Sequence, residues 1–427
     1  MVTAAPGRLD PEPSVFTQPI NGARTCHDGA KASSRAVRRL IRQAAHPPRL
    51  CILIVGVTMV LAGCGGASPA SRQHALVVVV RGLANPRQMS FGPDGALYVA
   101  EAGDGGHARC AKDPSTGARI CAGATGAIVR LAHGVVTRLL TGLPSVAGAG
   151  GAESSGPADV ILSRGDLVFV TQDTQIDRAG ANQFGQPGRL LGTLISTRAS
   201  GGARVVVDLA RFEASHNPDH GTGAASAADV IDSDPYALAA YGGGYAVADA
   251  AGNDLLWVSP SGTIRVLAVF PVQHEVAAAG LVGRSARRVT VQSVPTSVVV
   301  GPDGALYVSE LTGFPFNPGH ARVWRVVPGH PPSVYASGFT NISAIAFDRS
   351  GRLLVLEINR AGLRDTTAPG ELIRVARGNS TVLASAGLSW PTGVAVAADG
   401  SIFVANDGIS PATGPGSHGE IVRVRTS

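Results

Sequence analysis

The sequence predicts an all-β protein, a six-bladed β-propeller whose N-terminal strand completes the last blade. Three observations predict it: the composition, a unit that recurs six times, and a spare strand at one end that matches a missing strand at the other. Only 15% of the 427 residues are charged, while 55 are glycine and 28 are proline, which disfavours coiled coils and long helices. A hydrophobic content of 44% argues against general disorder.

Residues 1–63 are expected to be a leader rather than part of the fold. Five arginines between positions 35 and 49 precede the apolar run 51–62, which is too short to span a bilayer but suits a signal-peptide core. The run ends in Leu61-Ala62-Gly63-Cys64, which resembles a bacterial lipobox with Cys64 as the lipidated residue. A buried apolar segment followed by a Gly-rich linker is the alternative.

This leader implies export and a lipid anchor at the outer face of the cell membrane of a bacterium. We expect three parts: leader 1–63, flexible tether 64–74 and propeller 75–427. Residues 1–34 are long for the start of a signal peptide, which points to a translation start assigned too far upstream.

The charge distribution argues against a nucleic-acid partner. The leader contains eight basic and three acidic residues, so it carries most of the net charge of +6. The remaining sequence has 28 basic and 27 acidic residues and no basic tract.

The cysteines are consistent with an exported protein. Cys26 and Cys51 lie in the leader, which leaves Cys110 and Cys121 as an even pair in the propeller. We expect a disulfide between them, with two free buried thiols as the alternative. A zinc site is poorly supported because only His107 lies nearby.

The repeated unit is a short apolar strand, a tight glycine-containing turn and a second strand. Four clear copies cover 85–101, 294–310, 341–357 and 390–406, and two weaker copies cover 156–172 and 234–249. An Asp-Gly or Ser-Gly turn supplies the positive φ that a hairpin needs. Third strands are expected at 127–131, 189–195, 254–258, 322–326, 371–375 and 420–424. Fourth strands are expected at 135–140, 203–209, 263–270, 333–336 and 380–384.

The ends of the chain complete one another. The sixth copy stops after its third strand at Val424, and residues 75–80 form a spare apolar strand before the first copy. Pairing the two closes the ring and removes exposed sheet edges.

One face of this propeller is predicted to carry the function. Turns between strands one and two, and between three and four, are short. The long loops all fall on the opposite face, at 102–126, 173–188, 210–233, 271–293, 311–321, 358–370 and 407–419. Loops on a rigid scaffold commonly carry binding sites, so we expect a protein or small-molecule partner on this long-loop face.

Aligned copies place one polar residue at the end of each second strand. These six residues, the candidate ring, are Glu101, Gln172, Asp249, Glu310, Glu357 and Asn406. The starts of the inner strands add Gln88, Asp159 and Ser297. Such oxygen ligands around one axis could hold Ca²⁺, and clustered carboxylates could act as a base. The alternative is that strand ends at a water-filled tunnel are simply polar.

Histidines give weaker signals. His107, His320 and His418 all precede third strands and share the long-loop face, where they could bind metal or transfer protons. His216 and His220 have the spacing of a helical metal pair, but Pro218 and Gly221 favour a turn. Residues 249–254 indicate turn chemistry rather than a calcium loop.

The repeat resembles NHL-type propellers. More narrowly, residues 306–326 (LYVSELTGFPFNPGHARVWRV) resemble the signature of ScyD/ScyE-type secreted propellers. Three further stretches add to this resemblance: 217–219 (NPD), 232–236 (DSDPY) and 248–255 (ADAAGNDL). The resemblance covers residues 75–427 and implies fold and export, but no particular reaction.

Two functional classes follow from these observations. The favoured one is a non-enzymatic binding module that uses its long-loop face. The alternative is a Ca²⁺-assisted hydrolase or lactonase with its site in the central tunnel. Asp159 is the only carboxylate among the aligned inner-strand starts, which leaves the ligand set of such enzymes incomplete. The substrate and the oligomeric state are not encoded in any motif that we identify.

Overall fold

The structure is a computed structural model of the chain. It describes residues 74–113, 117–172, 174–177, 182–197, 202–221, 230–281, 285–376, 378–409 and 419–425. The chain divides into two compact units, 1–67 and 68–427, and every described residue belongs to the second. The leader, Cys64, His418 and all of the tether except its last residue therefore lie outside the described residues.

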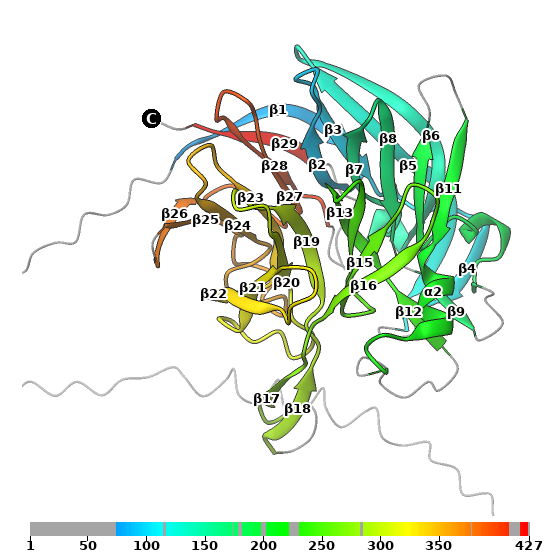
Figure 1. The fold of residues 1–427 in the computed structure, drawn as a ribbon. Coiled ribbons are helices and arrows are strands. Elements are labelled where there is room, and N and C mark those ends of the chain that lie inside the picture. The colour runs from blue at the N-terminus through cyan, green and yellow to red at the C-terminus, as the bar shows by residue number, and fades with distance from the viewer. Residues whose placement is uncertain are drawn as a thin grey trace, which may run out of the picture. The chain divides into compact units, whose positions relative to one another are not determined.

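The second unit is a six-bladed β-propeller, which confirms the predicted fold class (Figure 1). Blades one to three contain these strands in chain order: β2 (Pro86–Phe91), β3 (Leu97–Glu101), β5 (Arg119–Ala132) and β6 (Val135–Ala147); β7 (Pro157–Ser163), β8 (Asp166–Thr171), β10 (Thr193–Thr197) and β11 (Ala203–Asp208); β13 (Pro235–Tyr241), β14 (Gly244–Asp249), β15 (Asp254–Val258) and β16 (Ile264–Val269).

Blades four to six follow the same plan. Their strands are β19 (Pro295–Val300), β20 (Leu306–Glu310), β21 (Ala321–Val326) and β22 (Ser333–Phe339); β23 (Ile342–Phe347), β24 (Leu353–Glu357), β25 (Glu371–Ala376) and β26 (Asn379–Ala384); β27 (Gly393–Val396), β28 (Ile402–Asn406), β29 (Gly419–Val424) and β1 (Leu76–Leu83). All pairs within a blade are antiparallel, and tight turns join the first two strands, as at Gly95 with a φ of 74°.

Hydrophobic packing between blades forms the core. Every residue of β3, β20 and β24 is buried, because a second strand is covered on both faces by neighbouring blades. One cluster joins the strands of blade three to Val298, Leu306 and Trp324 of blade four. Another joins Leu354 and Leu372 of blade five to Val404 of blade six. The repeated apolar strands thus supply both faces of each blade with a partner.

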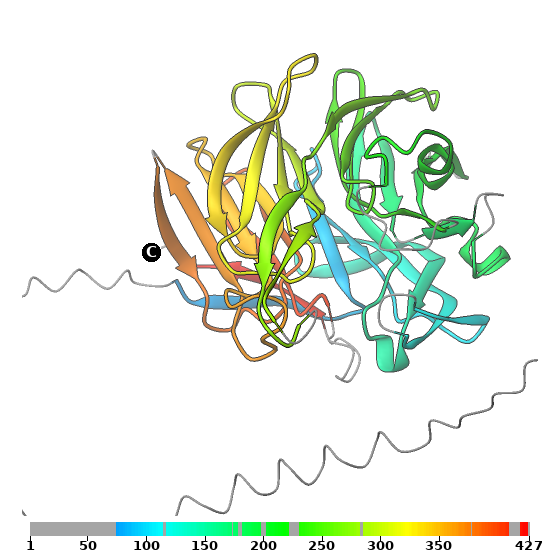
Figure 2. The ribbon, with the colours of Figure 1, turned by 90° about the horizontal axis from the view of Figure 1, so that it is seen from below.

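The ring is closed as predicted. Strand β1 pairs with β29 from Leu76 opposite Val424 to Leu83 opposite Gly419, so the N-terminal strand completes the sixth blade (Figure 2, blue beside red). Successive inner strands, β2, β7, β13, β19, β23, β27 and again β2, contact one another around the whole ring.

The long loops contain elements that the repeat did not predict. These are β4 (Arg109–Lys112), β9 (Thr174–Asp177), β12 (Val230–Ser233), β17 (Gln273–Ala277), β18 (Arg287–Val291), the helix α2 (Leu209–His216) and the single turns η1 (Ala149–Gly151) and η2 (Gln186–Gly188). The β17–β18 hairpin extends away from the blades in Figure 1. Within the described part of the chain, no helix combines the length and hydrophobicity needed to span a membrane.

Two local predictions can be compared with the structure. The third strand of blade two is Thr193–Thr197 rather than 189–195, because η2 and a turn occupy the preceding residues. Helix α2 ends at His216, where Asn217 adopts a left-handed conformation with φ 42°. His216 and His220 therefore do not share a helix face, which confirms that Pro218 and Gly221 mark a turn.

Candidate functional site

Five of the six inner strands have a shift in pairing register near their first residues, at the long-loop face. In β2, β7, β13, β19 and β23 the pairing register shifts at the second or third residue. Such bulges redirect side chains. The buried polar residues at these positions are Arg87, Gln88, Asp159, Tyr236, Thr296, Ser297 and Ser343.

Gln88 spans the ring. It starts from blade one, and its Nε2 donates hydrogen bonds to the carbonyl of Thr296 in blade four (3.2 Å) and of Ser343 in blade five (2.8 Å). Ser297 accepts a hydrogen bond from the backbone N–H of Ile345 at 3.3 Å. These two candidate residues therefore tie blades together at the tunnel end.

Asp159 lies in a comparable position between blades two and three. Its carboxylate accepts hydrogen bonds from its neighbour Val160 N–H (2.7 Å) and from Leu238 N–H in blade three (2.8 Å). Burial raises the pKa of Asp159 to about 7, and the two backbone donors oppose that rise. A buried carboxyl that titrates near neutral pH could exchange a proton with a ligand.

Arg87 is a site residue that the sequence comparison missed. Its Nη2 donates to the Ser154 carbonyl, while its buried Nε and Nη1 have no hydrogen-bond partner. Burial lowers the pKa of Arg87, and the nearby Tyr236 and Asp234 oppose that shift. Its charge could have marked it, because no other copy has a charged residue at this position. The other copies have Ala158, Tyr236, Thr296, Ser343 and Thr392 there.

The candidate ring residues hold the chain as it enters each blade. Oxygen atoms of Glu101, Asp249, Glu357 and Asn406 accept the backbone N–H of Ala84, Asp234, Thr340 and Ser389 at 2.7–3.0 Å. Glu310 accepts from the Ser293 hydroxyl at 2.6 Å. Gln172 instead donates to Asp234 at 3.3 Å.

Each of these side chains forms its hydrogen bonds with groups of its own blade, or with the segment that leads into the same or the next blade. The described residues contain no group of three His, Cys, Asp or Glu side chains arranged to hold a metal ion.

Burial raises the pKa of Glu357 to about 8 and also raises the pKa of Asp249 and Glu310. Three backbone N–H donors of residues 234, 251 and 252 surround Asp249 Oδ1, so residues 249–254 do form a turn.

A pocket of about 680 Å³ opens on the long-loop face beside blade one. Its walls come from the β1–β2 connection (Gly82–Ala84), the segment after β3, the β4–β5 hairpin and the connection to blade two. His107, Arg119 and Asp104 contribute the charged or polar side chains. The predicted Cys110–Cys121 disulfide is confirmed, with an S–S distance of 2.02 Å, and Cys121 lines this pocket.

Asn85 fixes one wall of the pocket. Its Nδ2 donates to the carbonyls of Gly103 (2.9 Å) and Gly151 (3.2 Å) and to Asp104 Oδ1 (3.1 Å). Two loops that are distant in sequence are thereby held together. The shape of this part of the pocket is therefore set by hydrogen bonds within the fold.

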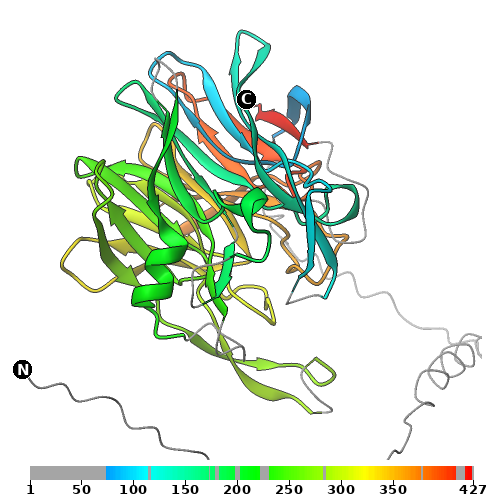
Figure 3. The same ribbon diagram turned by 90° about the vertical axis from the view of Figure 1, so that its right-hand side faces the viewer.

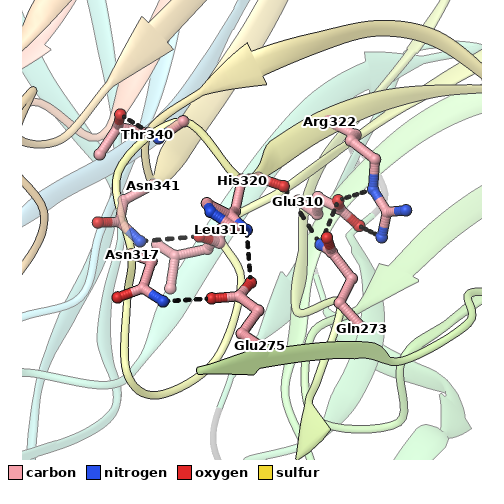
Figure 4. A network of polar contacts seen from close by, with 10 residues as sticks. Gln273, Glu275, Glu310, Leu311, Asn317, His320, Arg322, Thr340 and Asn341 are labelled. Atoms are coloured by element: carbon pink, nitrogen blue, oxygen red, sulfur yellow. Dashed lines mark hydrogen bonds and ion pairs between the residues drawn. The ribbon is translucent and has the colours of Figure 1, made fainter. Parts of the chain in front are cut away.

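His320 belongs to a separate polar network in blade four (Figure 4). Its Nδ1 lies 3.1 Å from Glu275 Oε1 of β17, and Asn317 Nδ2 donates to Glu275 Oε2 at 2.7 Å. Gln273 of the same strand donates to Glu310 at 3.3 Å and to the His320 carbonyl at 3.2 Å. These contacts attach the β17–β18 hairpin to the blade, and no motif pointed to Gln273 or Glu275 in advance.

Comparison with known proteins adds the architecture alone. No protein-family model and no curated protein matches the chain. Among solved structures, a glucose dehydrogenase is 12% identical with a TM-score of 0.48, over 83% of this chain and 100% of the other. A streptogramin B lyase is 13% identical with a TM-score of 0.45, over 84% and 100%. The virginiamycin B lyase of Staphylococcus aureus is 14% identical with a TM-score of 0.41, over 79% and 83%.

Proposed function

We propose that this chain is an exported, lipid-anchored propeller that binds a small organic anion in the pocket beside blade one. One observation carries the proposal. The pocket is built from four segments of the long-loop face, and its volume of about 680 Å³ falls in the range of small-molecule sites.

The lining suggests the kind of ligand. Arg119 and His107 can donate hydrogen bonds or positive charge to an anionic group. Asp104 Oδ1 already accepts a hydrogen bond from Asn85. The glycine and alanine walls, including Ala147 and Ala149, leave room for an apolar body.

The hydrolase alternative receives less support from the described residues. Gln88 and Asp159, its tunnel candidates, are engaged with backbone groups of other blades. Ca²⁺ bound by the candidate ring remains a proposal, and a calcium-dependent rise in melting temperature that Glu310→Gln weakens would support it. Membership of the ScyD/ScyE-type propellers likewise remains a proposal, based on the four stretches described above.

The pocket can be tested with a defined probe set. Thermal melting of the full chain would be measured with a panel of small organic carboxylates, sulfonates and phosphates. A compound that stabilises the wild type should lose its effect in Ala149→Trp, which fills the pocket. Val135→Trp adds the same side chain on the opposite face of blade one and should leave the effect intact. Equal responses of both variants would contradict the proposal.

A further inference from the structure

Three of the four stretches that carry the family resemblance, 217–219, 232–236 and 248–255, meet at one place in blade three. Asp249 and Asp254 face each other as cross-strand partners at the ends of β14 and β15. Helix α2 lies beside β9, β10 and β12 (Figure 3). Its Glu213 reaches the same region, because Glu213 Oε2 lies close to Gly252 in the turn between β14 and β15. Asp219 follows α2 and accepts a hydrogen bond from Asn253 at 3.0 Å. We call Glu213, Asp219, Asp249 and Asp254 the blade-three carboxylate cluster.

Asp254 is the unusual member. It is 0% exposed, and neither of its carboxylate oxygens has a hydrogen-bond partner. The described charged groups that act on it are Asp249, Glu213 and Asp219, all carboxylates. A buried carboxylate without a partner is costly, so this position requires a compensating group.

The other three members of the cluster are held near Asp254 by hydrogen bonds and packing. Asp249 and Asp219 accept backbone hydrogen bonds, from Asp234 N–H at 2.7 Å and from Gly221 N–H at 2.8 Å. Glu213 is 4% exposed, and burial together with the neighbouring carboxyl groups raises its pKa to about 8. A Cβ atom on Gly252 would lie 3.3 Å from both Glu213 Oε2 and Asp249 Cγ, so glycine at this position leaves room for the two carboxyl groups to lie close together.

We propose that this cluster binds a hard divalent cation of the calcium class, with Asp254 and Glu213 as its principal ligands. All donors here are oxygen atoms, which suit such an ion. The four carboxyl groups do not yet form a coordination shell, because no three described His, Cys, Asp or Glu side chains are arranged to hold a metal ion. Binding draws Asp254 and Glu213 toward the ion, and Ca²⁺ tolerates irregular oxygen geometry better than Mg²⁺ does.

This cation is structural and independent of the pocket beside blade one. It joins α2 to the turn between β14 and β15, and so fixes a long-loop insertion to its blade. Loss of the ion should loosen α2 and the following turn while the six blades persist.

The test uses the full chain after treatment with a chelator. Adding CaCl₂ up to about 10 mM, above the weak end of extracellular calcium sites, should raise the melting temperature. Calorimetry should find one bound ion per chain, and amide exchange across residues 209–221 should slow. MgCl₂ should give a smaller shift.

Three variants make the result specific. Asp254→Asn should abolish the calcium-dependent shift in melting temperature. Glu213→Gln, at a residue slightly more exposed than Asp254, should weaken the shift. Glu275→Gln removes a buried carboxylate from β17, outside both the cluster and the candidate ring, and should retain the full shift. No shift in the wild type, or an undiminished shift in both Asp254→Asn and Glu213→Gln, would overturn the proposal and leave protons as the compensating charge. If Asp254→Asn does not fold, the comparison of Glu213→Gln with Glu275→Gln decides.

Discussion

Glu357 and Asp159 are buried carboxyl groups that accept backbone N–H groups. Glu357 Oε1 accepts Thr340 N–H at 2.7 Å, and Asp159 accepts two backbone donors in the same way. These bonds fix the chain where it enters a blade, but each carboxyl loses hydration. Burial therefore raises the pKa of both groups, to about 8 for Glu357 and about 7 for Asp159.

Glu357 should make stability fall with rising pH. Between its ordinary pKa of 4.5 and its folded pKa of about 8, the folded state binds more protons than the unfolded state. The free energy of unfolding then decreases through this window, by at most about 1.4 kcal/mol per pH unit, and levels off above it. Glu357→Gln cannot ionise, so urea unfolding should show it gaining on the wild type as pH rises.

Asp159→Asn gives an internal check on that result. Its difference from the wild type should grow only from about pH 4 to about pH 7, because its folded pKa is lower. A difference that stays constant with pH in either variant would show that folding does not raise the pKa of that carboxyl.

Cys64 tests the proposed membrane attachment. Its thiol is the lipid acceptor in the lipobox interpretation, so Cys64→Ser should abolish labelling by a radioactive fatty acid and release the protein from the membrane fraction or leave the precursor uncleaved. Cys26→Ser is the control, because it lies in the leader and should change nothing. Absence of label in the wild type would exclude the anchor.

At the scale of elements, regular repeats were predictable and insertions were not. The recurring apolar strands and turns predicted the blades, and the segment before the first copy predicted the partner of β29. Helix α2 and the β17–β18 hairpin lie outside the repeat, and no second copy exists to reveal them. The Gln88 bonds to blades four and five depend on where a bulge directs the side chain, which no one-dimensional pattern encodes.

The candidate ring shows the same limit. Copy alignment identified the shared position of Glu101, Glu310 and Glu357, and the structure places each at the buried end of a second strand. Their partners differ: Glu101 and Glu310 each pair with an arginine, whereas Glu357 accepts only the Thr340 N–H among the described groups, and alignment does not display this difference. Asp254 was visible only as part of a turn, because its burial comes from packing in three dimensions.

The β4–β5 hairpin offers a prediction about one element. Cys110 and Cys121 are cross-strand partners separated by 11 positions, and closing so short a loop contributes about 2–3 kcal/mol in the chain-entropy model. The Cys110→Ser/Cys121→Ser variant should show faster amide exchange in residues 109–122, because the constraint is local. Exchange in β13–β16 of blade three should be unchanged. Equal protection of the hairpin in both proteins would mean that packing alone holds it.

At the scale of the whole propeller, stability depends on closing the ring. Each blade buries its faces against two neighbours, so blade six must be complete for the first and fifth blades to be covered. Strand β1 contributes to both contacts: Leu76 and Val78 pack against one cluster, and Val80 and Leu83 belong with the other. Without β1, the backbone of β29 would also become an open edge.

Deleting residues 75–81 should therefore destabilise the entire propeller. The variant loses most of the β1–β29 ladder and its apolar packing, so the free energy of unfolding should fall by several kcal/mol, a large part of a typical total. Urea unfolding would measure the loss, and light scattering would detect association through the exposed β29 edge. Val79→Thr is the matched control, because Val79 is 36% exposed and keeps the strand. A deletion variant that unfolds at the wild-type urea concentration would show that the six blades are stable without closure, and that packing between inner strands alone holds the ring.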